Sequence, residues 1–130
     1  MKTYLLSAVL ETLWAIRPEK LAAIVGVVMR HARGETLSAE DIAAVAAARP
    51  AQRQAGEIAV LPLFGTLAPR ANLMTESSGG TSLEMFGAAF RRAMTDPGVS
   101  AVVLDVNSPG GAVYGVDELS AEIYRTRGTK

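Results

Sequence analysis

The sequence predicts an α/β fold built on parallel strands, and three observations support this prediction. Two apolar runs, at residues 57–64 and 99–106, have the length and composition of buried strands. Segments with helical periodicity follow both runs, at residues 83–94 and again after Gly111. The resulting order of strand, loop, helix, strand, turn and helix is typical of α/β architectures with crossover connections. With 130 residues, 49% of them hydrophobic, the chain also has enough apolar material for a core.

The first ten residues resemble a secretory signal peptide only faintly. They carry one basic residue and a short apolar run, which Glu11 interrupts. The helical spacing of Leu6, Leu10 and Leu13 favours an amphipathic packing helix instead. The longest apolar run, Leu21–Met29, is much shorter than the about 20 residues that a membrane span requires, so we expect no transmembrane segment.

Residues 1–49 as a whole are expected to form a small helical unit. Pro18 occupies a first helical position and Gly34 a capping position, which together predict a helix over residues 18–33. Ser38 then predicts the start of a second, shorter helix, because acidic residues follow it in the first turn.

Residues 50–56 are polar and rich in residues that break regular structure, so we interpret them as a linker to an α/β domain at 57–130. The first strand of this domain, 57–64, contains Pro62, which restricts the strand to an edge, an end or a bulge. The next segment, Thr66–Gly80, has no periodicity and predicts a long mobile loop. Long loops in compact domains are often functional.

A helix is predicted after this loop, because Thr81-Ser82-Leu83-Glu84 has the pattern of a capping box. The apolar residues of one helical face are Leu83, Phe86, Gly87, Phe90 and Met94. Asp96-Pro97-Gly98 predicts a turn into strand 99–106, whose continuous Val and Leu content is typical of a parallel strand covered on both faces. Helical periodicity returns at Val116, Leu119 and Ile123. Because a further strand of the sheet is expected after this helix, we expect the chain to be a truncated part of its domain.

The segment Asn107–Gly111, at the end of the second strand, is the strongest functional signal in the sequence. Two adjacent glycines leave backbone N–H groups unshielded, where they can face a ligand or a developing oxyanion. Ligands in open α/β sheets bind beyond the carboxyl ends of strands, where this turn falls. A tight turn that needs positive φ explains the glycines equally well. A P-loop is excluded because no Lys-Ser/Thr pair follows the glycines. Gly110-x-Ala112-x-x-Gly115 matches a dinucleotide-binding fingerprint incompletely, because alanine replaces its second glycine.

The turn Ser108-Pro109-Gly110-Gly111 resembles the Ser-Pro-Gly-Gly signature of the Clp-protease and crotonase-like superfold. Further motifs narrow the resemblance to the signal peptide peptidase A family, and within it to the phage and prophage branch of minor capsid protein C or prohead proteases. These motifs are Trp14-Ala15-Ile16, Pro18–Leu21, Ile58–Gly65 and Gly79–Ser82. The resemblance implies the N-terminal portion of a Clp-protease/crotonase-like fold, preceded by a small helical unit.

The same resemblance implies a serine endopeptidase. In that family a neutral lysine takes the proton of the nucleophilic serine, and backbone amides stabilise the tetrahedral oxyanion. It assigns the amide role to Gly110 and Gly111, and it places Ser108-Pro109 in the same substrate-binding turn. Ala112-Val113 is expected to pair with an extended substrate by strand addition.

The nucleophilic serine and the lysine of this family lie on later elements, which places both beyond Lys130. We therefore expect this chain alone to cleave nothing. Ser108 is interpreted as a turn-former, Ser77-Ser78 as loop residues, and His31 as a solvated side chain near a helix C-terminus. For Asp105 two interpretations stay open: a buried acid paired within the site, or a polar residue at a strand end.

Charge and composition limit the partners. Thirteen basic residues balance thirteen acidic ones, so we expect neither nucleic-acid binding nor attraction to an anionic membrane. The chain has no cysteine and one histidine, which excludes disulfide frameworks, thiol nucleophiles and a His/Cys-rich metal site, and we expect no cofactor. The resemblance implies a capsid, scaffold or signal-peptide substrate, a homo-oligomer at full length, and a location in the bacterial cytoplasm or the virion. Two other function classes stay open: a non-catalytic capsid assembly protein, and a crotonase-like acyl-coenzyme A enzyme.

Overall fold

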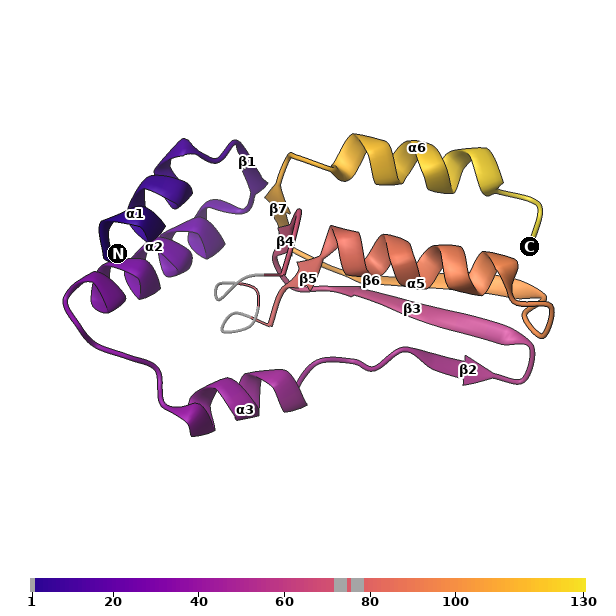
Figure 1. Cartoon of the computed structure of the whole chain (residues 1–130), viewed down its shortest axis with the longest axis horizontal. Coiled ribbons are helices and arrows are strands. Elements are labelled where there is room, and N and C mark those ends of the chain that lie inside the picture. Colours follow the sequence, from indigo (N-terminus) through magenta and orange to yellow (C-terminus); the bar gives the residue numbers. More distant parts are fainter. Residues whose placement is uncertain (1, 72–74, 76–78) are drawn as a thin grey trace.

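The computed structural model describes residues 2–71, 75 and 79–130, and it has the α/β character that the sequence predicts (Figure 1). The described residues form two sheets, with strand orders β2-β3-β6 and β1-β7-β4-β5. Helices α1 and α2 lie side by side at one end of the molecule, and α5 and α6 lie along the longer strands (Figure 1). The elements are α1 (Lys2–Glu11), β1 (Trp14–Ile16), α2 (Pro18–Ala32), α3 (Ala39–Ala47), β2 (Arg53–Ala55), β3 (Ile58–Phe64), β4 (Leu67–Ala68), β5 (Thr81–Ser82), α5 (Leu83–Thr95), β6 (Ala101–Asn107), β7 (Gly110–Ala112) and α6 (Val116–Thr126).

The longer strands form the predicted parallel pair. β3 and β6 run in register from Ile58 opposite Ala101 to Phe64 opposite Asn107. Between them in the chain lies α5, whose apolar face packs on the sheet. The buried core residues are Ala59, Leu61, Phe86, Phe90, Ala93 and Val99. Leu61 is only 1% exposed, so the centre of β3 is the most deeply buried part of this core.

The helical face predicted for α5 is confirmed, but the helix begins one residue later than its capping pattern suggests. Ser82 is the N-cap, and its hydroxyl accepts the amide of Met85 at 3.3 Å. Thr81 lies in β5 instead, and its hydroxyl donates to the carbonyl of Phe64 at 2.6 Å. The Thr81 side chain therefore joins the loop to the end of β3 rather than capping the helix.

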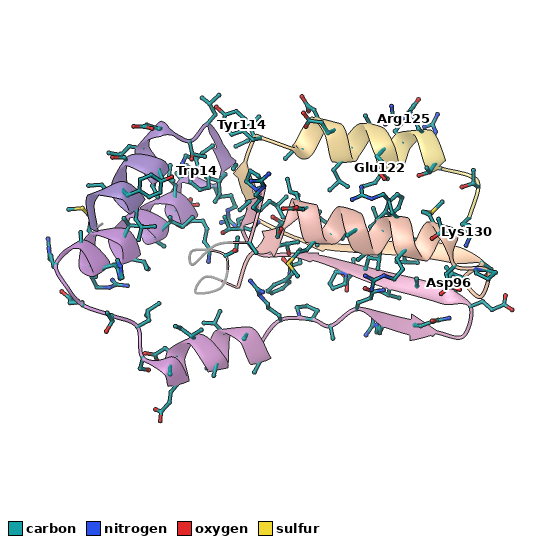
Figure 2. All side chains as sticks on the ribbon, viewed as in Figure 1. Trp14, Asp96, Tyr114, Glu122, Arg125 and Lys130 are labelled. Atoms are coloured by element: carbon teal, nitrogen blue, oxygen red, sulfur yellow. The ribbon has the colours of Figure 1, made fainter. Side chains whose placement is uncertain are left out.

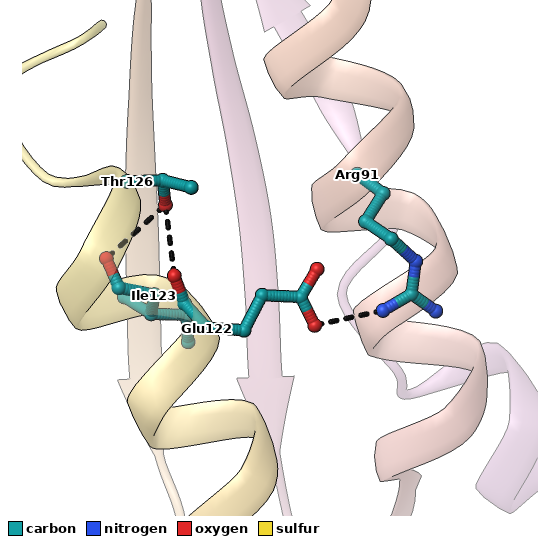
Figure 3. Close-up of polar contacts among 4 residues, drawn as sticks. All are labelled: Arg91, Glu122, Ile123 and Thr126. Carbon is teal, nitrogen blue, oxygen red and sulfur yellow. Dashed lines mark hydrogen bonds and ion pairs between the residues drawn. The ribbon is translucent and has the colours of Figure 1, made fainter.

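Helix α6 packs beside α5, as its periodicity predicts. Its Leu119 and Ile123 are partly buried against the main core. An ion pair of 2.8 Å between Arg91 of α5 and Glu122 of α6 joins the exposed sides of the two helices (Figure 3). The Thr126 hydroxyl donates to the carbonyls of Glu122 and Ile123 at 3.1 and 3.2 Å, which satisfies two backbone acceptors in the last turn of α6.

The N-terminal helices form a second hydrophobic cluster, distinct from the main core. Its buried residues are Val9 of α1 and Ile24 and Val28 of α2. Trp14 lies beside these helices (Figure 2), and together with Ile16 of β1 it packs against the cluster. The Trp14 indole N–H donates to the carbonyl of Val9 at 2.9 Å. β1 is therefore attached to the helix pair by its side chains.

Both helices predicted within residues 18–49 are confirmed. α2 begins at Pro18, and α3 follows the cap at Ser38. The Ser38 hydroxyl accepts the Asp41 amide at 3.0 Å, while the Asp41 carboxylate accepts the Ser38 amide at 3.2 Å, which makes a reciprocal capping box. Within the described ranges, no helix combines the length and apolar character needed to cross a membrane.

Five short strands lie where the sequence predicts no strand. β1 falls within the expected helical unit at 1–49, β2 within the expected linker at 50–56, β4 within the predicted loop at 66–80, β5 at the predicted helix cap, and β7 within the predicted glycine turn. Each has only two or three residues, which is too short to leave a periodic signal. β2 pairs antiparallel with the beginning of β3, with Arg53 opposite Val60, so this part of the linker belongs to the sheet.

Pro62 lies in the central strand of its sheet, although its residue type predicts an edge, an end or a bulge. β2 pairs with β3 only as far as Val60. Beyond that point, β6 is the one neighbour of β3 among the described strands. Because one side of β3 is already unpaired there, a residue without an N–H is tolerated.

β6 is parallel to β3 as predicted, but it is not covered on both faces by the described residues. Leu104 packs on the main core, whereas Val103 points to the opposite face and is 47% exposed. Val106 is 61% exposed near the end of the strand. β6 is also the edge of its sheet, since β3 alone pairs with it among the described strands.

Candidate functional site

The predicted glycine turn lies at the carboxyl end of β6 and is held to the end of β3. The Gly65 amide donates to the carbonyl of Asn107 at 2.9 Å. The Ser108 hydroxyl donates to the carbonyl of Gly65 at 2.6 Å and accepts the Gly110 amide at 3.1 Å. Ser108 therefore joins the ends of both parallel strands and fixes the direction in which the chain leaves β6.

Gly110 and Gly111 are glycines because two other backbones approach them closely. Gly110 has φ of +105°, in the region that side chains disfavour, and a Cβ there would lie 2.1 Å from the carbonyl oxygen of Ala15. A Cβ on Gly111 would lie 2.1 Å from the carbonyl oxygen of Leu67. Both obstacles are main-chain atoms, which cannot rotate away. The turn with positive φ is therefore present at Gly110, and at Gly111 the requirement is space.

The amides of this turn face acceptors within the chain. The Gly110 amide donates to Ser108, as described above. Gly111 lies opposite Ala15 in the antiparallel ladder, midway between two hydrogen bonds: Val113 N–H to the Leu13 carbonyl and Arg17 N–H to the Pro109 carbonyl, both 3.0 Å. Because hydrogen-bonded pairs recur at every second residue, Gly111 occupies a hydrogen-bonding position facing β1. A ligand can reach this amide only after β1 moves.

The predicted substrate segment Ala112-Val113 lies at the end of β7. Ala112 is 4% exposed and Val113 is 40% exposed. β7 is paired on both sides, with β1 antiparallel and with β4 parallel through Leu67 opposite Gly111. Strand addition of a substrate at this segment stays a prediction, and it requires one of these two neighbours to leave.

The remaining residues singled out from the sequence are separate from the turn or outside the described ranges. Asp105 is exposed, which agrees with the interpretation as a polar residue near a strand end. His31 lies in the last turn of α2. Ser77-Ser78 falls outside the described residues, as does much of the loop predicted at 66–80, although β4 lies within that range. Among the described residues, no group of His, Cys, Asp and Glu side chains could hold a metal ion.

An apolar cavity of about 290 Å³, which no sequence pattern predicts, lies between the N-terminal helices and the second sheet. Trp14 of β1 and Thr66, next to β4, are among its lining residues. The Thr66 hydroxyl is buried and has no hydrogen-bond partner among the described residues. The other lining residues are Lys20, Ala23, Ile24, Val27, Val28, Val45, Ala68 and Thr75.

Arg49, at the end of the predicted helical unit, is a further residue that sequence reasoning missed. Its guanidinium donates to the main-chain carbonyls of Thr75 and Gly80. Gly80 in turn donates its amide to the Thr75 carbonyl at 3.0 Å. Arg49 thus joins Thr75 to Gly80, the residue that precedes β5. No local pattern could reveal these contacts, because they join residues 26 and 31 positions apart.

Comparison with known proteins finds two phage proteins with similar sequences. The chain is 42% identical over 84 residues to the head-tail preconnector protein GP5 of Enterobacteria phage P21, and this match covers 63% of the chain. It is 38% identical over 73 residues to the capsid assembly protease C of Escherichia phage lambda, covering 56% of the chain. The matched region spans 17% of the length of each relative. No protein-family model matches the chain, and no solved structure matches it. The two relatives support similarity to prohead-protease-like proteins of phages.

Proposed function

We propose that this chain is part of a serine endopeptidase of the signal peptide peptidase A type that acts on a capsid or scaffold polypeptide during phage head assembly. The glycine turn carries this proposal, because it lies beyond the carboxyl end of a parallel strand, where open α/β sheets bind ligands. Similarity to a capsid assembly protease supports it independently. The Clp-protease/crotonase-like fold, and the division into a helical unit at 1–49, a linker at 50–56 and a peptidase domain at 57–130, belong to the same proposal.

In this proposal the turn supplies the oxyanion site. The nucleophilic serine oxygen attacks the carbonyl carbon of the scissile peptide while a neutral lysine takes the hydroxyl proton. The carbonyl oxygen becomes an oxyanion, which the amides of Gly110 and Gly111 stabilise after they have exchanged their present acceptors, Ser108 and β1, for the substrate. The lysine then returns the proton to the leaving amine, and water hydrolyses the acyl-enzyme. Loss of one such amide donor raises the barrier by about 3 kcal/mol in characterised enzymes.

Ser108 is a poor candidate for the nucleophile. Its hydroxyl donates to the Gly65 carbonyl and accepts the Gly110 amide, and no described lysine or histidine hydrogen-bonds to it. The proposal therefore places the serine and the lysine on a polypeptide segment outside these 130 residues. The free edge of β6 supports this arrangement, because a further parallel strand can pair there.

The test is proteolysis by the polypeptide that the gene encodes when its reading frame is followed to both ends. We expect cleavage of a fluorescent casein and of the phage scaffold protein, and loss of cleavage when the serine or lysine of the added segment is changed to alanine. The 130-residue chain should cleave neither substrate. The proposal fails if the reading frame contains no serine-bearing helix followed by a lysine, or if the longer polypeptide cleaves nothing.

A second candidate is a non-catalytic protein of head assembly. The observation in its favour is the similarity to a protein named as a head-tail preconnector, which covers more of the chain than the protease match. Pull-down with procapsid components separates the two functions. A binding protein should remain associated with an intact partner, whereas a peptidase should release fragments of it.

A further inference from the structure

β1 pairs with β7 as a peptide does when it binds to the edge of a sheet. It has three residues, and its pairing is antiparallel, with Trp14 opposite Ala112 and Ile16 opposite Gly110. It forms the edge of its sheet, and β7 is its one partner among the described strands. Extended peptides that bind to sheet edges make this same kind of main-chain pairing.

The two neighbours of β7 differ in how they are anchored. β4, on one side, is held within the second sheet by β5, and the Thr81 amide donates to the Thr66 carbonyl at 2.9 Å. β1, on the other side, has its side chains in the N-terminal cluster with Val9 and Ile24, which is distinct from the main core. β1 can therefore separate from β7 together with α1 and α2 without opening the main core. Separation of β4 from β7 would also require β4 to break its pairing with β5.

The shape of β7 fits a polypeptide backbone on this side. Gly110 has no Cβ, and the carbonyl oxygen of Ala15 occupies the space where one would lie. Ala15 itself is exposed, so its side chain contributes little to holding the strand. The contact between β1 and β7 is thus mainly between main-chain atoms, which any extended segment carries.

We infer that β1 is a built-in occupant of the β7 edge, and that its release opens this edge to an extended polypeptide running antiparallel to β7. This inference rests on the proposed function, because it makes the N-terminal helical unit an inhibitory element of the same substrate site. It predicts competition: a segment that pairs with β7 must displace β1.

A disulfide staple tests the competition directly. Leu13 and Val113 lie opposite each other, are 61% and 40% exposed, and are joined by the Val113 amide to the Leu13 carbonyl at 3.0 Å. The natural chain has no cysteine, so the double variant Leu13→Cys/Val113→Cys can form one disulfide only. The probe is a fluorescein-labelled peptide with the sequence of residues 11–18, and binding is followed by fluorescence anisotropy. We expect the oxidised variant to lose binding and the same variant to recover it on reduction, so that each preparation serves as its own control.

Two substitutions at one exposed position provide the opposite perturbation. Ala15→Pro removes an amide at a hydrogen-bonding position of the ladder and places a ring against β7, whereas Ala15→Thr keeps the amide. We expect Ala15→Pro to bind the peptide about tenfold more tightly than Ala15→Thr, because its own strand competes less. Circular dichroism and hydrogen exchange at β3 and β6 check that the main core stays folded.

The inference is overturned if the peptide binds equally to the oxidised and reduced staple, if Ala15→Pro gains no affinity, or if no form binds the peptide. None of these measurements depends on proteolysis. Failure of the peptidase proposal would leave the binding result intact, and failure of the binding result would leave cleavage by the longer polypeptide to be judged separately.

Discussion

Replacing Ser108 with alanine separates a structural serine from a nucleophilic one. The hydroxyl donates to the Gly65 carbonyl at 2.6 Å, with a longer contact of 3.3 Å to the Gly110 carbonyl, and it accepts the Gly110 amide at 3.1 Å. Each such bond stabilises a folded protein by about 1 kcal/mol, and partly buried partners that are left unsatisfied add to the loss. We therefore expect Ser108→Ala to lower the free energy of unfolding by about 2 kcal/mol.

The assay is urea denaturation and thermal melting followed by far-ultraviolet circular dichroism. For a chain of 130 residues, a loss of about 2 kcal/mol corresponds to a fall in Tm on the order of 8 °C. Ser120→Ala is the matched control, because Ser120 is exposed on α6, and its effect should stay within about 0.5 kcal/mol. Ser108→Thr retains the hydroxyl and should recover part of the loss.

Unchanged stability of Ser108→Ala would refute this reasoning. It would mean that the hydroxyl does not hold the turn, and a catalytic role for Ser108 would then have to be considered. In the longer polypeptide the expected outcome is reduced but measurable cleavage by Ser108→Ala. Complete loss of cleavage at full stability would identify Ser108 as the nucleophile.

Three further substitutions test the packing. Leu61→Ala, at a position 1% exposed, should lower the free energy of unfolding by about 3 kcal/mol in urea denaturation; a loss below about 1 kcal/mol would contradict the placement of the core at the centre of β3. Gly111→Ala should disrupt the second sheet, because the added Cβ meets the Leu67 carbonyl at 2.1 Å; rapid hydrogen exchange at β7 with protection kept at β3 is the expected signature, and unchanged exchange would count against it. Ser38→Ala should cost about 1 kcal/mol through loss of the α3 cap, with Ser38→Asp restoring most of it; equal melting of all three proteins would show that the cap contributes nothing.

The parts of the fold that the sequence predicts are those in which local pattern and tertiary packing agree. The apolar face of α5 can be predicted because Phe86 and Phe90 recur at helical spacing, and both are buried on the sheet. The parallel pairing of β3 and β6 follows from a helix between two apolar runs. Pro18 and Ser38 mark helix starts because their local chemistry favours those positions.

The second sheet could not be predicted, because no local pattern in the sequence marks its strands. Its strands have two or three residues, and they pair segments that lie far apart in the chain, such as Trp14 with Ala112. The glycines of the turn could be identified as special, but two explanations fitted them: exposed amides, or a tight turn that needs positive φ. The structure shows close backbones at Gly110 and Gly111, which no composition could reveal. Their role as oxyanion donors stays a prediction.

The open side of β6 determines how the chain behaves at high concentration. Alternate residues of this seven-residue strand direct main-chain groups to an edge that no described strand pairs with, and Val103 and Val106 add exposed apolar surface. Such an edge is a template for pairing with the same strand of a neighbouring molecule. The segment also has high β-propensity, with Asp105 as its one charged residue. Purified chain should therefore aggregate through β6, and a lysine in place of Val103 should keep it monomeric to higher concentration.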